Sequence, residues 1–125
     1  NVIFDLSTIK TRFANIGLMA QDKLIREQPR LVKGAVAGLV HGIKFWKSNP
    51  DAAKAYLKQI HKVSAADLDS IYEDGSKNVR SEPTPDLDGI QTAWESIPEL
   101  KARGPVDFKK FVDSRFIEEV LREMK

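Results

Sequence analysis

The segment of residues 29–50, PRLVKGAVAGLVHGIKFWKSNP, constrains the fold of this chain more than any other stretch. Its apolar residues recur at spacings of three and four, which places them on one face of a helix. This face is broad enough for a helix that packs on a protein core; it contains Leu31, Val32, Ala35, Val36, Leu39, Val40, Ile43 and Trp46. Pro29 suits a first helical position, and Asn49 ends the helix because a residue before proline disfavours the α conformation. We therefore predict a helix of about 20 residues, the longest in the chain.

Three glycines in this helix, Gly34, Gly38 and Gly42, follow one another at intervals of four residues. Each glycine costs a helix about 1 kcal/mol relative to alanine, so three together need a physical reason. We expect another helix or a strand to approach closely to this bare ridge, and a groove that faces a ligand is the alternative. In lipid such a ladder would favour helix dimerisation, but the flanking lysines argue against a membrane setting.

Capping residues and helix breakers set the limits of the other predicted helices. Asn49 is a good N-cap for the next helix, and Ser64 with Asp67 has the form of a capping box. Gly75 favours the end of the helix that Ser64 begins, and Pro98 should kink or shorten the helix that contains it. Besides the central helix, the predicted helices span residues 22–27, 50–61, 65–75, 86–102, 105–112 and 114–125. The last of these has an apolar face made of Phe116, Ile117, Val120, Leu121 and Met124.

Residues 1–20 differ from the rest because they favour extended structure. Residues 1–8, NVIFDLST, and 15–20, NIGLMA, are short apolar runs typical of strands or of an extended arm. Two extended pieces cannot form a stable sheet alone, so they should pair with other strands, lie across the helices or exchange into a neighbouring molecule. The chain begins with asparagine and shows no signal segment, so we expect a processed product or a piece of a longer protein. The fold class is thus predicted as mainly α: one domain of residues 1–125, a bundle of about six helices with a short N-terminal arm.

The distribution of charge is more informative than the formal net charge of +2. Residues 1–62 carry 11 Lys and Arg against 4 Asp and Glu, whereas residues 63–125 carry 9 against 14. We expect solvated faces of opposite sign that attract each other weakly across the bundle, and the alternative is a basic surface that meets an anionic partner. No run of about 20 uncharged apolar residues predicts a membrane-spanning helix.

No pattern in the chain has the spacing of a catalytic or metal site. Cysteine is absent, and His41 and His61, the two histidines, fall on separate predicted helices. The sequence contains no phosphate-binding loop, no nucleophile elbow and no zinc-protease motif. The aromatic residues in Lys44-Phe45-Trp46-Lys47 fit core packing better than stacking on nucleic-acid bases. We therefore expect no enzyme activity, no cofactor, no metal and no nucleic-acid partner.

The order of several segments resembles a known family. These are residues 18–20 (LMA), 22–33 (DKLIREQPRLVK), 47–54 (KSNPDAAK), 82–91 (EPTPDLDGIQ) and 104–108 (GPVDF). From about residue 15 onward, the chain resembles the C-terminal portion of the nitrate/sulfonate/taurine type of ABC-transporter substrate-binding protein, a group that includes binding proteins for thiamine precursors.

The resemblance implies part of a two-lobed, hinge-closing receptor, of the type II periplasmic-binding-protein fold, that captures a small organic or inorganic solute for a membrane permease. Residues 1–20 would then be the returning strand region, and residues 21–125 a helical cover of the first lobe. Arg12 and Gln21 are the candidate ligand contacts, while most ligand-contacting loops would lie upstream of residue 1. Gln21 stands where the family has Ser or Thr and is a weaker helix cap. The implied localisation is periplasmic or extracytoplasmic.

Two further functions remain open. A free-standing helical interaction module could dimerise through residues 2–6 or through the glycine ladder, and an arm-exchanged homo-oligomer would satisfy an exposed strand edge. An enzyme of the pyrimidine-synthesis branch of the same superfamily would need catalytic residues that the sequence does not provide.

Overall fold

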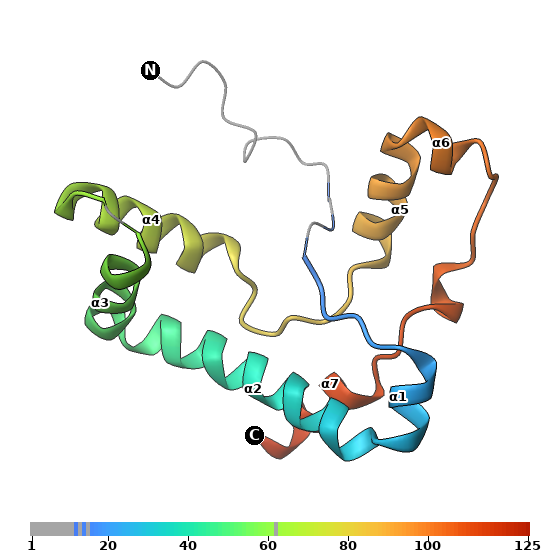
Figure 1. Cartoon of the computed structure of the whole chain (residues 1–125), viewed down its shortest axis with the longest axis horizontal. Coiled ribbons are helices and arrows are strands. Elements are labelled where there is room, and N and C mark those ends of the chain that lie inside the picture. Colours follow the sequence, from blue (N-terminus) through green and yellow to red (C-terminus); the bar gives the residue numbers. More distant parts are fainter. Residues whose placement is uncertain (1–11, 13, 15, 62) are drawn as a thin grey trace. The chain divides into compact units, whose positions relative to one another are not determined.

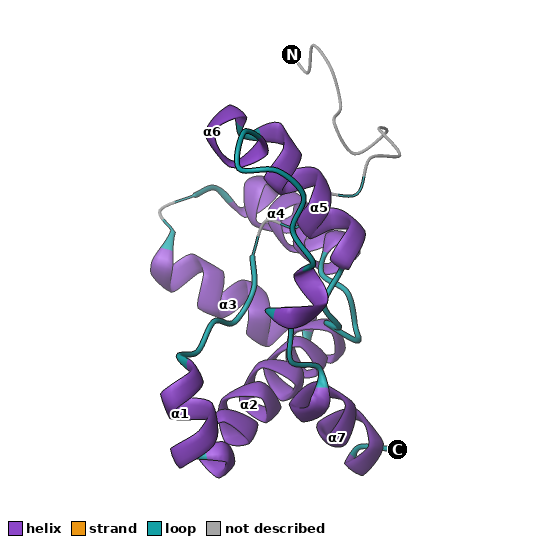
Figure 2. Ribbon diagram, turned by 90° about the vertical axis from the view of Figure 1, so that its right-hand side faces the viewer, coloured by secondary structure: helices purple, strands orange, loops and turns teal. Residues whose placement is uncertain are grey.

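The computed structural model describes residues 12, 14, 16–61 and 63–125. Within these ranges all regular secondary structure is helical (Figure 2). The mainly α fold class is therefore confirmed. The helices are α1 (Asp22–Glu27), α2 (Pro29–Ser48), α3 (Pro50–Ile60), α4 (Ala65–Asn78), α5 (Leu87–Ser96), α6 (Pro98–Lys101) and α7 (Arg115–Glu123), with a 3-10 turn, η2 (Phe108–Lys110) (Figure 1). Residues 15–20 were predicted as a strand or an extended arm; the strand alternative is wrong for residues 16–20, which belong to neither a strand nor a helix. The apolar arm of residues 1–8 lies outside the described residues.

The helices belong to two compact units. One, called unit 1 here, comprises Asn1–Met19 and Pro85–Ser114, and the other, unit 2, comprises Ala20–Thr84 and Arg115–Lys125. Unit 2 contains α1 to α4 and α7, whereas unit 1 contains α5, α6 and η2. The single domain predicted for residues 1–125 stays a prediction.

The centre of unit 2 is the contact between α2 and α7, which lie side by side (Figure 1). Val40 of α2 and Val120 of α7 are each 2% exposed, and Ile117 is 6% exposed. Partly buried apolar side chains surround this cluster: Val36, Ala37, Leu121 and Met124. The apolar face predicted for the last helix is thus confirmed at its centre, because hydrophobic burial holds α7 against α2.

The C-terminal end of α2 is fixed to α4 by hydrogen bonds. The indole Nε1 of Trp46 donates to Ser76 Oγ at 2.9 Å, and Lys47 Nζ donates to the Ser76 carbonyl at 2.7 Å. The Tyr72 hydroxyl in turn donates to the Trp46 carbonyl at 3.2 Å. The helix was predicted to end at Gly75, but it continues to Asn78. The bonds to Ser76 explain this difference. On its other side α4 packs against α3, and the two helices bury Ala53, Leu57 and Leu68.

Two of the predicted caps have different outcomes. The capping box is confirmed, because the Asp67 N–H donates to Ser64 Oγ at 3.2 Å and the hydroxyl of Ser64 donates to Asp67 Oδ2 at 2.6 Å. Asn49, in contrast, does not cap α3 with its side chain. Its Nδ2 donates to the Phe45 carbonyl at 2.9 Å and so closes the end of α2. Because Pro50 has no N–H to be satisfied, the asparagine amide is used by the preceding helix.

Unit 1 is built around α5. Asp86 caps this helix by accepting the Gly89 N–H at 3.0 Å, and Pro98 ends it as predicted, with Ile97 in an extended conformation between α5 and α6. Trp94 packs edge-on against Phe108, with ring centroids 5.6 Å apart. The helix predicted for residues 105–112 is wrong beyond the short turn η2, which Asp107 begins.

Candidate functional site

One face of α2 is left uncovered by the other elements of unit 2. We call it the outer face; it consists of Leu31, Gly34, Ala35, Gly38, Leu39, Gly42 and Phe45, all of which are exposed. Leu31 is 57% exposed and Phe45 56% exposed, large fractions for apolar side chains. A methyl group at any of the three glycines would meet no atom within 4 Å. The close approach predicted for the glycine ridge is therefore absent among the described residues.

The position of the outer face follows from helix geometry. Successive residues of an α-helix are rotated by about 100°, so Gly38 and the buried Val40 point in nearly opposite directions. The predicted apolar face of α2 was therefore too broad on one side: Leu31, Ala35 and Leu39 are exposed, whereas Val32, Val36 and Ile43 are partly buried. The helix packs on α7 with the other side.

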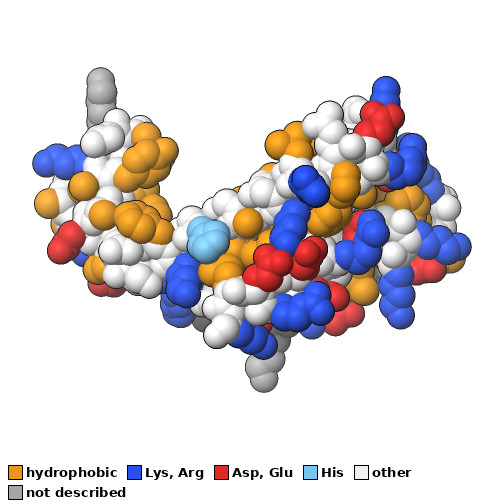
Figure 3. Space-filling model, turned by 90° about the horizontal axis from the view of Figure 1, so that it is seen from below, with side chains coloured by type: hydrophobic (Ala, Val, Ile, Leu, Met, Phe, Trp, Pro, Cys, Tyr) orange, Lys and Arg blue, Asp and Glu red, His pale blue; other side chains and the backbone are white. Residues whose placement is uncertain are grey.

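The outer face carries no charged side chain. The cations of α2 are Arg30, Lys33, Lys44 and Lys47, and the helix contains no Asp or Glu. A helix at a protein surface normally exposes charged and polar residues, and a helix that is apolar nearly all round is normally buried. Exposed hydrophobic side chains interspersed with Lys and Arg are also visible on the surface shown in Figure 3. The composition of α2 is therefore that of a helix with neighbours on two sides.

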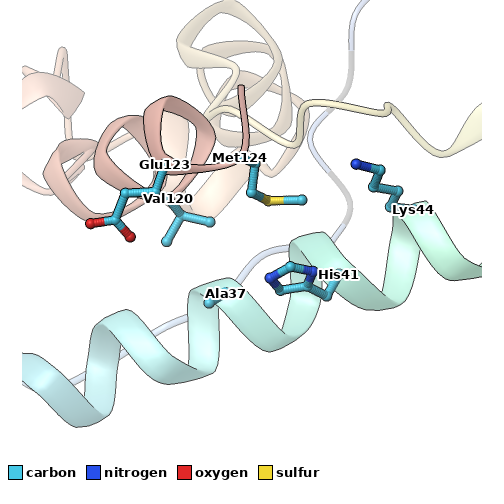
Figure 4. A pocket seen from close by; sticks show the side chains of 6 residues that line it. All are labelled: Ala37, His41, Lys44, Val120, Glu123 and Met124. Atoms are coloured by element: carbon cyan, nitrogen blue, oxygen red, sulfur yellow. The ribbon is translucent and has the colours of Figure 1, made fainter.

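An open groove of about 280 Å³ lies between α2 and α7. It is lined by Ala37, His41, Lys44, Val120, Glu123 and Met124. His41 and Lys44 extend from α2, the Met124 side chain lies across from them on the α7 side, and the Glu123 carboxylate points away from both (Figure 4).

The chemistry of this groove is limited. Its cations could attract a small anion, but His41 and Lys44 are exposed and nothing encloses the space between them. Small-molecule sites usually bury most of their ligand in a concave, largely apolar cavity. Glu123 is already bonded to Lys33 at 2.7 Å, so it is not an unpaired general base. The groove therefore lacks the features of a solute pocket or of a catalytic centre.

Lys33 joins α2 to α7 through two carboxylates. Its Nζ lies 2.7 Å from Glu119 Oε1 and 2.7 Å from Glu123 Oε1. The hydrogen bonds that Lys33 donates to the Glu119 and Glu123 carboxylates raise the pKa of Lys33 above its ordinary value of 10.5. The bond from Lys33 lowers the pKa of Glu119 below its ordinary value of 4.5. Lys33 thus helps to hold the two helices together.

The two candidate ligand contacts lie in different units, and neither lines the groove. Arg12 forms ion pairs with Asp86 at 2.9 Å and Asp88 at 3.0 Å, beside a hydrogen bond from the Ala14 N–H to the Gly89 carbonyl at 3.0 Å. Gln21 precedes α1, is exposed and makes no side-chain cap, which agrees with its prediction as a weaker cap. A role of either residue in ligand binding stays a prediction.

The described residues contain neither a metal-binding cluster nor a membrane-spanning helix. No group of three or more His, Cys, Asp or Glu side chains there could hold a metal ion. Within the same ranges, no helix has the length and apolar character required to cross a membrane.

Comparison with known proteins gives no relative: no protein-family model, curated protein or solved structure matches this chain. The candidate site therefore stands on the geometry of α2 and its neighbours alone. Sequence reasoning missed the outer face, although one signal could have revealed it. The lack of any charged residue among positions 31, 34, 35, 38, 39, 42 and 45 already marks a side of the helix that is unlike a solvated surface.

Proposed function

We propose that this chain is the non-catalytic, helical part of an ABC-transporter solute-binding protein, in which it covers the lobe that helps to capture a small organic or inorganic solute. The observation that carries the proposal is the uncharged outer face of α2, since a covering helix must present an apolar face to what it covers. The segment order that resembles the nitrate/sulfonate/taurine type supports the same assignment. The partners would be the solute and a membrane permease, in an extracytoplasmic compartment.

The proposed mechanism is capture by closure of two lobes around the solute. In that mechanism, the helices described here would supply stability and shape to one lobe, and the solute would be held mainly by other segments. The groove between α2 and α7 is open, which agrees with a part that covers a lobe and does not enclose the solute by itself. Arg12 and Gln21 remain the candidates for direct contact from this chain.

Thermal-shift measurements on the full-length parent protein would test the proposal. We expect one class among sulfonates, nitrate, taurine and pyrimidines to raise the melting temperature with increasing ligand concentration, because a ligand that binds only the folded state stabilises it. The 125-residue chain alone should show no such rise. Upstream coding sequence without a secretory signal and without two strand–helix lobes would refute the assignment.

A second candidate function is a free-standing helical interaction module. The exposed glycines of the outer face favour it, because small residues allow another helix to approach the backbone closely. Sedimentation of the isolated chain separates the possibilities. A monomer would argue against self-association, both through this face and through exchange of the arm formed by residues 1–20, whereas a concentration-dependent dimer would favour the module.

A further inference from the structure

We infer that a second copy of this chain binds at the N-terminal end of α5, where its Arg12 and Ala14 replace the same two residues of the first copy. The surface concerned, called the α5 site here, consists of Asp86, Asp88 and Gly89. The inference rests on the second candidate function, because it names the contact through which the chain would associate with itself. It requires neither a solute nor a permease.

The α5 site holds a guanidinium group between two carboxylates. Arg12 Nε lies 2.9 Å from Asp86 Oδ2 and Arg12 Nη2 lies 2.9 Å from Asp86 Oδ1, so two donors of the arginine bind one carboxylate. The third nitrogen, Nη1, lies 3.0 Å from Asp88 Oδ2. A bidentate pair of this kind is specific in geometry as well as in charge, and the single ammonium of a lysine cannot form it. The site therefore selects an arginine.

The α5 site also fixes the backbone two residues after the arginine. The Ala14 N–H donates to the Gly89 carbonyl at 3.0 Å. Gly89 is buried, and a methyl group added to it would lie 2.9 Å from the Ala14 nitrogen, so only glycine permits this approach. The site thus recognises an arginine together with a backbone N–H two positions later. A second copy of the chain necessarily carries the same pair, which makes it the partner that the geometry fits.

This contact can be released and formed again between two copies. The side chains of Arg12 and Asp88 are 56% and 78% exposed, and exposed ion pairs are individually weak. The described contacts are ion pairs and a hydrogen bond, and none of them requires that Arg12 and α5 belong to one chain. Exchange of an identical element between copies is a low-cost route to a dimer.

The segment that follows Ala14 favours exchange. Ile16 and Met19 are 93% and 97% exposed, and Leu18 is 59% exposed. In an exchanged dimer with two-fold symmetry, each of these segments crosses to the other copy, so the two run in opposite directions past each other at the axis. Their apolar side chains would cover each other there, and removal of this area from water favours the dimer.

Sedimentation velocity of the full 125-residue chain tests the inference. The wild-type chain should form a dimer as its concentration rises. Arg12→Glu and Asp88→Arg should each raise the dissociation constant of the dimer at least about tenfold, because each places like charges opposite each other. Asp88 is changed because Asp86 also caps α5 through the Gly89 N–H.

A matched control is Arg103→Glu, which changes the net charge as Arg12→Glu does. Arg103 also belongs to unit 1, is exposed and forms no ion pair with a described residue, so this variant should leave the dissociation constant unchanged.

Mixing the two variants supplies the sharper criterion. In an equimolar mixture, the intact Arg12 of the Asp88→Arg chain can bind the intact α5 site of the Arg12→Glu chain. The mixture should therefore dimerise at concentrations at which each variant alone is monomeric, and helical circular dichroism would show that both variants fold.

Three results would overturn the inference: a wild-type chain that is monomeric at every concentration, a dimer that Arg12→Glu leaves unchanged, or a mixture that does not dimerise. A dimer that Gly38→Leu abolishes and Arg12→Glu does not would also overturn it, while still favouring the interaction module. Failure of the parent protein to bind a solute would refute the transport function and would affect none of these results.

Discussion

Glycine has opposite roles at two positions of this chain. A methyl group added at Gly38 would meet no atom within 4 Å, so nothing in unit 2 requires glycine there. A methyl group added at Gly89 would lie 2.9 Å from the Ala14 nitrogen and 3.1 Å from Asp86 Cγ. Gly89 is therefore required by the close contact between α5 and Ala14. Gly38, in contrast, lies on a surface of α2 that no other described residue of unit 2 covers.

Gly38→Ala should raise the free energy of unfolding by about 1 kcal/mol, because alanine is the better helix former and the added methyl group meets only open space. Urea denaturation followed by circular dichroism would measure the gain. The matched control, Gly89→Ala, should reduce stability, since the Ala14 backbone and the Asp86 cap would have to move. If Gly38→Ala destabilised the isolated chain, the glycine ridge would already be packed within the fold.

The ion pair between Lys33 and Glu119 predicts a pH dependence. The pKa of Glu119 is lowered in the folded state, so the folded state binds fewer protons than the unfolded state near pH 4.5. The stabilisation by this pair is therefore complete above the unfolded pKa and is lost as the pH falls through the lowered folded value. The raised pKa of Lys33 acts at the other end, where stabilisation is lost as the pH rises through a value above 10.5.

Glu119→Gln isolates this contribution. The difference in unfolding free energy between the wild-type chain and Glu119→Gln should be constant at neutral pH, should shrink as the pH falls below 4.5, and should disappear below the lowered pKa of Glu119 in the folded state. A matched control is Glu118→Gln, whose side chain is exposed and forms no ion pair with a described residue. A difference that persisted to low pH would mean that Glu119 stabilises the contact by packing and not by charge.

At the scale of secondary structure, the contact between α2 and α7 dominates the stability of unit 2. Ile117→Ala should lower the free energy of unfolding by roughly 2 kcal/mol or more, because it leaves a cavity beside Val40 and Val120. Leu39→Ala, on the outer face, is the control and should change it by less than about 0.5 kcal/mol. Chemical denaturation measures both values. Equal losses would show that the outer face is packed in the free chain.

The limits of α2 could be predicted from the sequence because they depend on local chemistry. Pro29 begins the helix and the Asn49-Pro50 step ends it, and both effects act within a few residues. The side on which α2 packs could not be predicted in the same way. Apolar residues surround most of this helix, so their spacing identifies what can be buried but not which neighbour buries it.

Contacts between segments distant in sequence also explain other features that the sequence could not predict. Gly75 does not end α4, because Ser76, one residue later, is bonded to Trp46 and Lys47. Arg12 was a candidate for ligand contact, and nothing in its neighbourhood in the sequence indicates the ion pairs with Asp86 and Asp88. Local motifs such as the Ser64 capping box were therefore predictable, whereas the candidate site required the three-dimensional arrangement.

At the scale of the whole molecule, the uneven distribution of charge places cations of the first half of the chain next to carboxylates of the second half. Each of five ion pairs joins a cation from residues 1–62 to a carboxylate from residues 63–125. Three carboxylates lie near α2 or α3: Glu119, Glu123 and Asp69, which lies 2.6 Å from Lys54. Exposed pairs of this kind contribute little individually, but their common direction agrees with the predicted attraction between the two halves of the chain.

Burial is unequal between the two units, and hydrogen exchange should reveal it. Among the described residues, the buried hydrophobic side chains all belong to unit 2: Val40, Ala53, Leu57, Leu68, Ile117 and Val120. Amides of α2 and α7 should therefore exchange slowest, and those of α5 and α6 faster, because local opening exposes little apolar surface there. Mass spectrometry after deuterium labelling would measure the rates. Slower exchange in α5 than in α2 would contradict this order.

The core of unit 2 is completed by the last helix of the chain. Val40 is buried against Ile117 and Val120, which lie 77 and 80 residues further along the chain and are therefore synthesised much later. During synthesis on the ribosome, α2 therefore emerges with both its outer face and its α7-binding side exposed. The interval before α7 appears is when nascent chains of this protein would most need a chaperone, and a stop codon before residue 115 would make that exposure permanent.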